Sequence, residues 1–300
     1  MSAAPGRPQA SSLPLGGTGR RPKGAPVSTL IQVGDCRFAC TVTGTGMPLL
    51  LMHGAEGNHR MFEALVPHLA PHFTVIAYDQ RDCGDTTNPE SPATMSDLAD
   101  DAAGLLAALG HAQAAVYGSS FGGRVAQALA HRHGHMVSHL VLGNTWALVD
   151  DLAALNPDGI AAIHALRAGL PHTAEALADY FFPAAFLTHR ADLRDIFRQA
   201  QSQTARSQRR QALVAERMPL DAAVLRMPTL VLTGDQDLVV PPAISLALAR
   251  AIPHARAVCL NGIGHAAALQ APATVAAQLA AFCLDAVDTT TARSPEEHHG

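Results

Sequence analysis

Short runs of apolar residues recur along the chain, and stretches with helical spacing separate most of them. Several runs, such as residues 48–54 and 73–79, are apolar almost without interruption. Such runs are typical of parallel strands, which are buried on both faces of a sheet. We predict eight strands in all, at residues 28–34, 37–44, 48–54, 73–79, 114–118, 139–144, 228–234 and 255–260.

Helical patterns fill most of the gaps between these runs. Residues 61–70 place apolar side chains at Met61, Leu65 and Leu69, and a second pattern starts at a candidate cap, Ser96, and stops at Gly110. Alternating strands and helices predict an α/β fold with a mostly parallel sheet and helices on both faces.

One region breaks this alternation. From about residue 149 to residue 226 only helical patterns occur, among them "GIAAIHALRAGL" and "RADLRDIFRQAQSQ". A helical insertion between two strands predicts a cap over the carboxyl ends of the sheet, where open parallel sheets bind their ligands. We therefore expect one domain over 28–288, with a core of 28–148 and 227–288 and a helical cap at 149–226.

The ends of the chain differ from this domain in composition. Residues 1–27 are rich in Pro, Gly and Ser and contain no acidic residue. Residues 289–300 are mostly polar and contain few apolar side chains. We predict that both are disordered tails. The N-terminal residues lack the apolar segment of a signal peptide, and no apolar run approaches the ~20 residues of a membrane helix.

Composition and charge narrow the class of partner. The chain is 48% hydrophobic and 15% charged, with a net charge of −4, which gives no electrostatic reason to expect nucleic acid. Its five cysteines lack the spacing of a metal site or a disulfide framework. We expect a cytoplasmic protein that acts on a small molecule and has no membrane contact, and we leave a homodimer open.

The stretch "AVYGSSFGG" places two serines between a predicted strand and a helix. It fits G-x-S-x-G, a strained turn that needs small residues two positions before and two after the nucleophile. Centring the motif on Ser120 places Gly118 and Gly122 there, whereas centring it on Ser119 places Tyr117 and Phe121 there. Ser120 is therefore the candidate nucleophile, although the motif alone also fits a structural glycine-rich turn.

An acid and a histidine follow in the order that such a nucleophile requires. "GDQD" offers Asp235 and Asp237 after one predicted strand, and "GIGH" offers His265 after the next. Carboxyl ends of parallel strands share one edge of a sheet, so we expect these side chains to lie beside Ser120.

Together, "HGAEGN", "YDQRDCG", "GSSFGG", "GDQD" and "GIGH" resemble the α/β-hydrolase superfamily, in its serine-nucleophile, esterase-like branch, over residues from about 28 to 286. The resemblance implies the α/β-hydrolase fold with an eight-stranded sheet. It also implies a triad of Ser120, Asp237 and His265, because the family's acid typically sits three residues after a strand-ending glycine, here Gly234. Asp235 would then shape the turn.

The resemblance further implies an oxyanion hole formed by the backbone N–H groups of Ala55 and Phe121. One motif departs from the family pattern, because "DQRDCGDT" carries Asp82 where glycine is common.

A Ser–His–Asp triad predicts hydrolysis of a carboxylic ester, lactone or thioester through an acyl-enzyme on Ser120, which needs neither a metal nor an organic cofactor. A C–C bond hydrolase or an acyltransferase with the same triad, and a non-catalytic binding protein on this fold, are the alternatives.

Three aromatic residues are candidates for substrate binding. Trp146 follows a predicted strand, and Phe182 and Phe186 belong to an aromatic segment of the insertion, 180–186; packing within the protein is the alternative for each. Residues 190–217 contain seven arginines and three acids, which fits a solvated helix face or attraction for anionic substrates.

Overall fold

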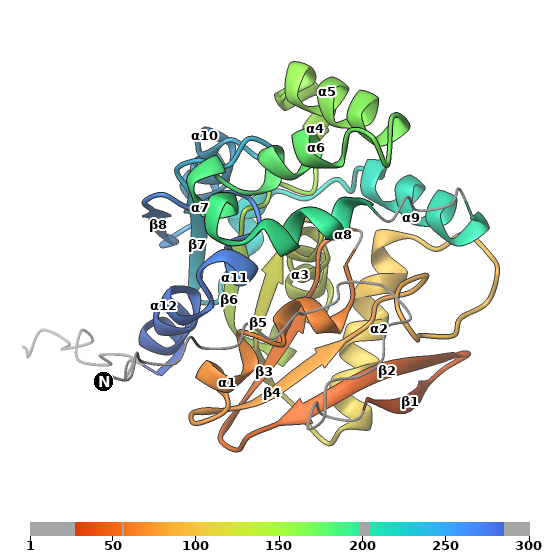
Figure 1. The fold of residues 1–300 in the computed structure, drawn as a ribbon. Coiled ribbons are helices and arrows are strands. Elements are labelled where there is room, and N and C mark those ends of the chain that lie inside the picture. The colour runs from red at the N-terminus through yellow and green to blue at the C-terminus, as the bar shows by residue number, and fades with distance from the viewer. Residues whose placement is uncertain (1–27, 56, 199–203, 285–300) are drawn as a thin grey trace, which may run out of the picture.

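The computed structural model describes residues 28–55, 57–198 and 204–284, and it contains an eight-stranded sheet (Figure 1). The order of the strands is β1-β2-β4-β3-β5-β6-β7-β8. They are β1 (Thr29–Val33), β2 (Cys36–Thr43), β3 (Met47–Met52), β4 (Phe73–Tyr78), β5 (Ala114–Ser119), β6 (Val137–Gly143), β7 (Thr229–Gly234) and β8 (Arg256–Leu260). The predicted α/β-hydrolase fold is confirmed, while the predicted tails lie outside the described residues.

Seven of the eight strands run in the same direction, and β2 runs opposite to them. β2 pairs antiparallel with both β1 and β4, whereas the pairs among β3 to β8 are all parallel. The register aligns Ser119 of β5 with Gly143 of β6, and Gly234 of β7 with Leu260 of β8. The loops that follow these strands therefore start side by side at one edge of the sheet.

The apolar strands bury alternate residues on opposite faces. Leu50 of β3 belongs to a core with the helices α2 (Met95–Ala108), α3 (Phe121–Arg132) and α10 (Pro242–Ala251). Its neighbours Leu49 and Leu51 belong to a second core. That core includes α1 (Val66–Leu69), α11 (Ala267–Gln270) and α12 (Pro272–Leu284). Burial on both faces explains the continuous apolar runs in the sequence.

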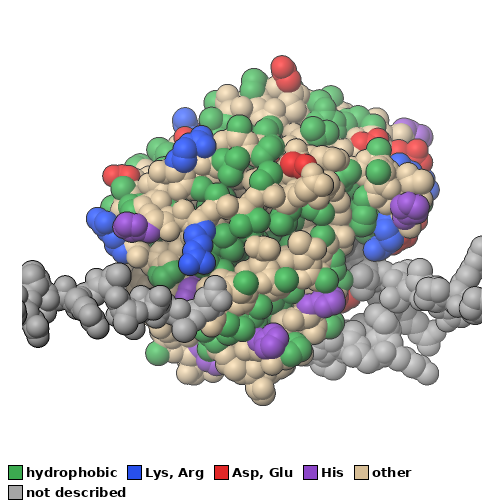
Figure 2. Space-filling view, turned by 90° about the vertical axis from the view of Figure 1, so that its left-hand side faces the viewer, with side chains coloured by type: hydrophobic (Ala, Val, Ile, Leu, Met, Phe, Trp, Pro, Cys, Tyr) green, Lys and Arg blue, Asp and Glu red, His purple; other side chains and the backbone are tan. Residues whose placement is uncertain are grey.

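Figure 2 shows the face of the molecule on which α12 lies in Figure 1, and hydrophobic side chains are spread over it. Helix α12 packs against the second core and has no charged residue. Its exposed positions are mainly alanine, such as Ala273, Ala277 and Ala281. None of the helices in the described part of the chain has both the length and the apolar composition that crossing a membrane requires.

Two helical expectations need correction. The pattern at 61–70 forms the 3₁₀ turn η1 (His59–Phe62) and the short helix α1, because Pro67 has no N–H and is tolerated only in a first helical turn. Helix α2 is capped by Thr94, not Ser96: the Thr94 side chain accepts from the Asp97 N–H, and the Asp97 carboxylate accepts from the Thr94 N–H. The predicted stop, Gly110, has φ +81°.

Between β6 and β7 the described residues form helices and no strand. The helices are α4 (Leu152–Leu155), α5 (Pro157–Ala168), α6 (Ala174–Phe181), α7 (Ala184–His189), α8 (Arg194–Arg198) and α9 (Ala205–Ala215), with the 3₁₀ turns η3 (Ala191–Leu193) and η4 (Ala222–Val224). Figure 1 shows the α-helices along the upper side of the sheet, with α9 at the right. Backbone contacts join this insertion to the sheet edge, for example from the Ala266 N–H to the Phe181 carbonyl.

Arg124 of α3 holds the two ends of the insertion together. This buried guanidinium donates to the Leu148 carbonyl at one end and to the Val214 and Glu216 carbonyls at the other, at 2.6–2.8 Å. Burial lowers the pKa of Arg124 to about 10, so it stays charged at neutral pH. Both ends of the insertion are therefore hydrogen-bonded to α3, the helix that starts next to Ser120.

Helix α9 is attached to the loop that follows β4. Arg209 pairs with Asp82, with Nε 3.0 Å from Oδ2, and Arg206 donates to the carbonyls of Cys83 and Thr86. Asp82 has φ +59°, a region in which glycine is more usual. The departure from the family motif at this position therefore supplies an ion pair to the insertion.

Candidate active site

Ser120 occupies a strained turn between β5 and α3. Its φ of +54° and ψ of −121° are rarely adopted by residues with a side chain. A Cβ atom on Gly118 would come within 2.3 Å of the Gly122 carbonyl oxygen, and one on Gly122 within 2.2 Å of the Met52 oxygen. The turn therefore needs both glycines. They lie two positions before and two positions after Ser120, as the G-x-S-x-G motif predicts.

Three side chains from separate loops form a continuous hydrogen-bonded series. The Ser120 Oγ lies 2.9 Å from Nε2 of His265, and Nδ1 of His265 lies 2.9 Å from Oδ2 of Asp237. An ionised carboxylate only accepts hydrogen bonds, so we assign the imidazole proton to Nδ1. Nε2 is then free to accept the proton of the serine hydroxyl.

Asp237 is buried and accepts three further hydrogen bonds. The N–H groups of Val239 and Val240 donate to Oδ1 at 2.9 and 2.8 Å, and the side chain of Asn144 donates to Oδ2 at 2.9 Å. Asn144 follows β6 with φ +50°, and the sequence analysis did not identify it. The available signal was an asparagine directly after a strand, since asparagine tolerates positive φ better than most residues.

Asp235 has a different position. Its Oδ1 accepts from the N–H groups of Gly262 and Ile263, at 2.7 and 3.3 Å, in the turn that leads to His265. This arrangement agrees with the expectation that Asp235 shapes the turn and Asp237 faces the histidine.

The two backbone groups expected to form the oxyanion hole flank Ser120. Phe121 is the first residue of α3, so its N–H has no partner within the helix. A Cβ atom on Gly54 would lie 3.5 Å from the Ser120 Cβ, which places the segment before Ala55 beside the nucleophile. The role of these N–H groups in binding an oxyanion stays a prediction.

His53 supports the loop that carries Ala55. Its Nε2 accepts from the Gln80 N–H at 3.1 Å, so Nδ1 is protonated and donates to the Gly54 carbonyl at 2.7 Å. That carbonyl belongs to the same peptide group as the Ala55 N–H. Burial lowers the pKa of His53 to about 4, and the neutral ring positions this peptide at physiological pH.

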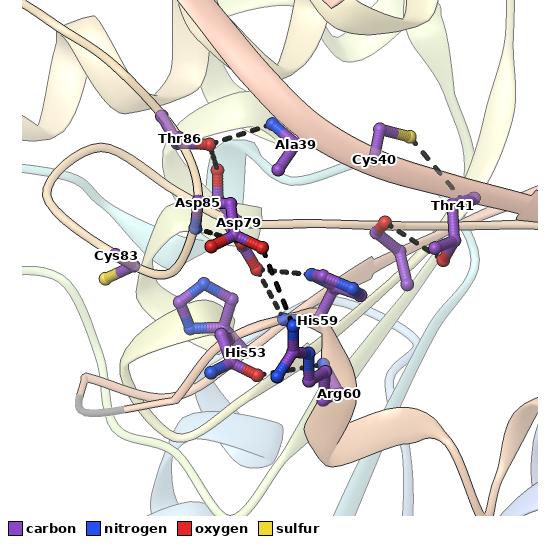
Figure 3. A network of polar contacts seen from close by, with 12 residues as sticks. Ala39, Cys40, Thr41, His53, His59, Arg60, Asp79, Cys83, Asp85 and Thr86 are labelled. Carbon is purple, nitrogen blue, oxygen red and sulfur yellow. Dashed lines mark hydrogen bonds and ion pairs between the residues drawn. The ribbon is translucent and has the colours of Figure 1, made fainter. Parts of the chain in front are cut away.

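A second buried acid holds the segment after this loop (Figure 3). Oδ1 of Asp79 accepts from the His59 N–H and lies 2.7 Å from His59 Nδ1, while Oδ2 accepts from the Asp85 N–H. Burial favours a raised pKa for Asp79, but the interactions with His59 outweigh it and lower the pKa. The ionised carboxylate thereby joins η1 to the loop after β4.

The predicted aromatic residues lie in packed surroundings. Trp146 is 3% exposed and packs with Ile163 and Leu177 of the insertion, and the Phe182 ring stacks on that of Phe186 with centroids 5.7 Å apart. The ring beside His265 belongs to Phe181, and the centroids of the two rings lie 5.5 Å apart. Phe181 lies in the aromatic segment 180–186 but was not among the residues predicted to bind substrate. Substrate contact of Trp146, Phe182 and Phe186 stays a prediction.

Across residues 28–55, 57–198 and 204–284, no three His, Cys, Asp or Glu side chains are placed to hold a metal ion.

Comparison with known proteins gives matches over most of the chain. Residues 47–272 match the family described as alpha/beta hydrolase fold. The chain is 29% identical to 2-hydroxymuconate semialdehyde hydrolase of Pseudomonas sp. strain CF600 over 260 residues, which cover 81% of this chain and 89% of the relative.

Two solved structures are similar in fold. A thermophilic esterase from Thermogutta terrifontis matches with a TM-score of 0.72 and 29% identity, covering 84% of this chain and 96% of the esterase. The enol-lactonase from Burkholderia xenovorans LB400 matches with a TM-score of 0.72 and 25% identity, covering 86% of this chain and 100% of the lactonase. The family match shows that the chain belongs to the α/β-hydrolase fold family. The three relatives show that it is similar to hydrolases over more than four fifths of its length.

Proposed function

We propose that the protein is a serine hydrolase that cleaves a carboxylic ester, lactone or thioester through an acyl-enzyme on Ser120. One observation carries the proposal: the series from the Ser120 Oγ through His265 to Asp237, with both hydrogen bonds at 2.9 Å. A hydroxyl in this setting has a base within reach and an acid that fixes the tautomer of that base.

The reaction follows from these positions. His265 Nε2 accepts the hydroxyl proton as the Ser120 Oγ attacks the carbonyl carbon, and the Asp237 carboxylate stabilises the imidazolium that forms. The N–H groups of Ala55 and Phe121 bind the oxyanion; loss of one such donor typically lowers kcat by about 10²–10³. His265 then protonates the leaving alcohol, and water attacks the acyl-enzyme with the same base.

The relatives support ester chemistry without selecting one substrate. The names of the Thermogutta and Burkholderia proteins refer to ester and lactone cleavage, whereas the Pseudomonas relative is named for 2-hydroxymuconate semialdehyde. C–C bond hydrolysis with the same triad is therefore the second candidate.

A parallel assay separates these candidates. We expect the protein to hydrolyse p-nitrophenyl butyrate and a simple lactone faster than 2-hydroxymuconate semialdehyde. Ser120→Ala should abolish the ester activity. Ser119→Ala should keep the fold and much of the activity, because Ser119 is small and takes no part in the series from Ser120 through His265 to Asp237. Turnover of the semialdehyde alone would favour the C–C bond hydrolase.

A further inference from the structure

Arg210 of α9 is a buried cation beside the proposed oxyanion hole. Its side chain is 5% exposed, its Nε donates to the Ala55 carbonyl at 3.0 Å, and its Cζ lies 4.2 Å from the centroid of the Phe121 ring. Ala55 and Phe121 are the two residues whose N–H groups are expected to bind the oxyanion. The guanidinium therefore contacts both residues that are expected to form the oxyanion hole.

The helix that carries Arg210 is fixed at this position by its neighbours. Arg206, Arg209 and Arg210 are spaced i, i+3 and i+4, so they share one face of α9. Arg209 has a carboxylate partner in Asp82, and Arg206 donates to two carbonyls of the same loop. The first two arginines attach the helix to the core.

Arg210 differs from Arg209 in having no acidic partner within the described residues. Its Nη2 donates to the Gln80 side-chain oxygen at 3.1 Å, and its Nη1 is buried with no hydrogen-bond partner in that part of the chain. A buried cation and a buried donor are both costly when they are unpaired. An incoming anion would satisfy both.

We propose that Arg210 forms a carboxylate-binding subsite, so that the preferred substrate is an ester whose acyl group carries a second, ionised carboxyl group. The inference rests on the proposed serine-hydrolase function. A guanidinium is planar and pairs well with the two oxygens of a carboxylate. The leaving alcohol must face His265, which protonates it, whereas Arg210 contacts Ala55 and Phe121. The anionic group therefore belongs to the acyl part of the substrate.

The test compares charged and uncharged esters of the same shape. The monomethyl esters of succinate, glutarate and adipate are each assayed beside the matching ω-amide methyl ester, and the ratio of the two kcat/KM values is recorded. Hydrogen bonds to charged groups are strong enough to give a preference of about tenfold or more for the carboxylate at one or more chain lengths.

Variants then assign this preference to Arg210. Arg210→Gln should bring the ratio to about one, and Arg210→Lys, which keeps the charge without the planar fork, should give an intermediate ratio. Arg217→Gln removes the same charge from an exposed position of the insertion and should keep the wild-type ratio.

Each outcome has a defined meaning. A wild-type ratio near one at all three chain lengths overturns the subsite, whether or not the variants fold, and so does a preference that persists in Arg210→Gln. Labelling with a fluorophosphonate distinguishes the loss of this subsite from the absence of an activated serine. If the probe labels the protein and charged and neutral esters react equally, this inference alone fails; if no ester reacts and the probe does not bind, the proposed function fails with it.

Discussion

Asp235 and Asp237 lie two residues apart, and their surroundings give them different roles. Asp237 accepts from His265 Nδ1, whereas Asp235 accepts from two backbone N–H groups of the turn before His265. We predict that Asp237→Asn lowers kcat by about 10⁴, because an amide no longer holds the required imidazole tautomer. Asp235→Asn keeps an accepting oxygen in the turn and should lose far less.

Both variants are measured on one ester under saturating conditions. Equal losses in the two variants would contradict the assignment of Asp237 as the acid of the triad.

At this scale, the residues that could be predicted from sequence are those with a local signature. The glycines around Ser120 select it over Ser119 through a short sequence motif. A Cβ atom on Gly118 would meet the turn itself, and one on Gly122 would meet the end of β3. Asn144 and Arg210 have no such signature. Asn144 reaches Asp237 only through the β6–β7 pairing, and Arg210 contacts Ala55 across 155 positions of sequence.

At the scale of elements, the attachment of α9 depends on the Asp82–Arg209 ion pair. Both side chains are largely buried, with exposures of 2% and 14%. We predict that Arg209→Gln increases hydrogen exchange of the α9 amides, because the helix loses its carboxylate contact with the core. Asp192→Asn, which breaks an exposed pair with Arg190 within the insertion, is the matched control and should leave α9 unchanged. Unaltered exchange in Arg209→Gln would show that the ion pair does not hold the helix.

The end of α6 makes a second contact with the site, through the Phe181 ring beside His265. We predict that Phe181→Leu changes the chain-length preference among p-nitrophenyl esters by up to tens of fold, since one methylene group in an apolar pocket is worth ~1–3 kcal/mol. Phe186→Leu, whose ring stacks on Phe182, should change it less. An identical ester profile in Phe181→Leu and wild type would contradict a contact between this ring and the substrate.

The elements differed in how well they could be predicted. The inner strands were predictable because both faces of the sheet are buried there, which leaves long apolar runs, whereas the edge strands β1 and β8 are largely exposed. The helix expected at 61–70 is interrupted because Pro67 outweighs the apolar spacing, and the start of α2 is set by the reciprocal bonds of Thr94 and Asp97.

At the scale of the whole molecule, His53 should make stability depend on pH. Its pKa is lowered by burial to about 4 in the folded protein, whereas an exposed histidine has a pKa of about 6.5. Between these values the unfolded chain binds more protons, so the stabilising contribution is complete above about pH 6.5 and is lost as the pH falls towards 4. The loss from this residue is on the order of 3 kcal/mol.

Denaturant unfolding of the wild type and of His53→Gln between pH 4.5 and 7.5 measures this effect. The free energy of unfolding of the wild type should fall more steeply with decreasing pH than that of the variant. Parallel curves would mean that the His53 ring is not held neutral in the folded state.

The family match and the relatives support hydrolase chemistry for the whole molecule, and the central claim is that Ser120 is the nucleophile. Peptide mass mapping after reaction with a fluorophosphonate tests this most directly, because the probe forms a covalent bond with an activated serine. We predict a single adduct on Ser120, strongly slowed in His265→Ala and absent in Ser120→Ala. An adduct on Ser119, or undiminished ester hydrolysis by Ser120→Ala, would contradict the account.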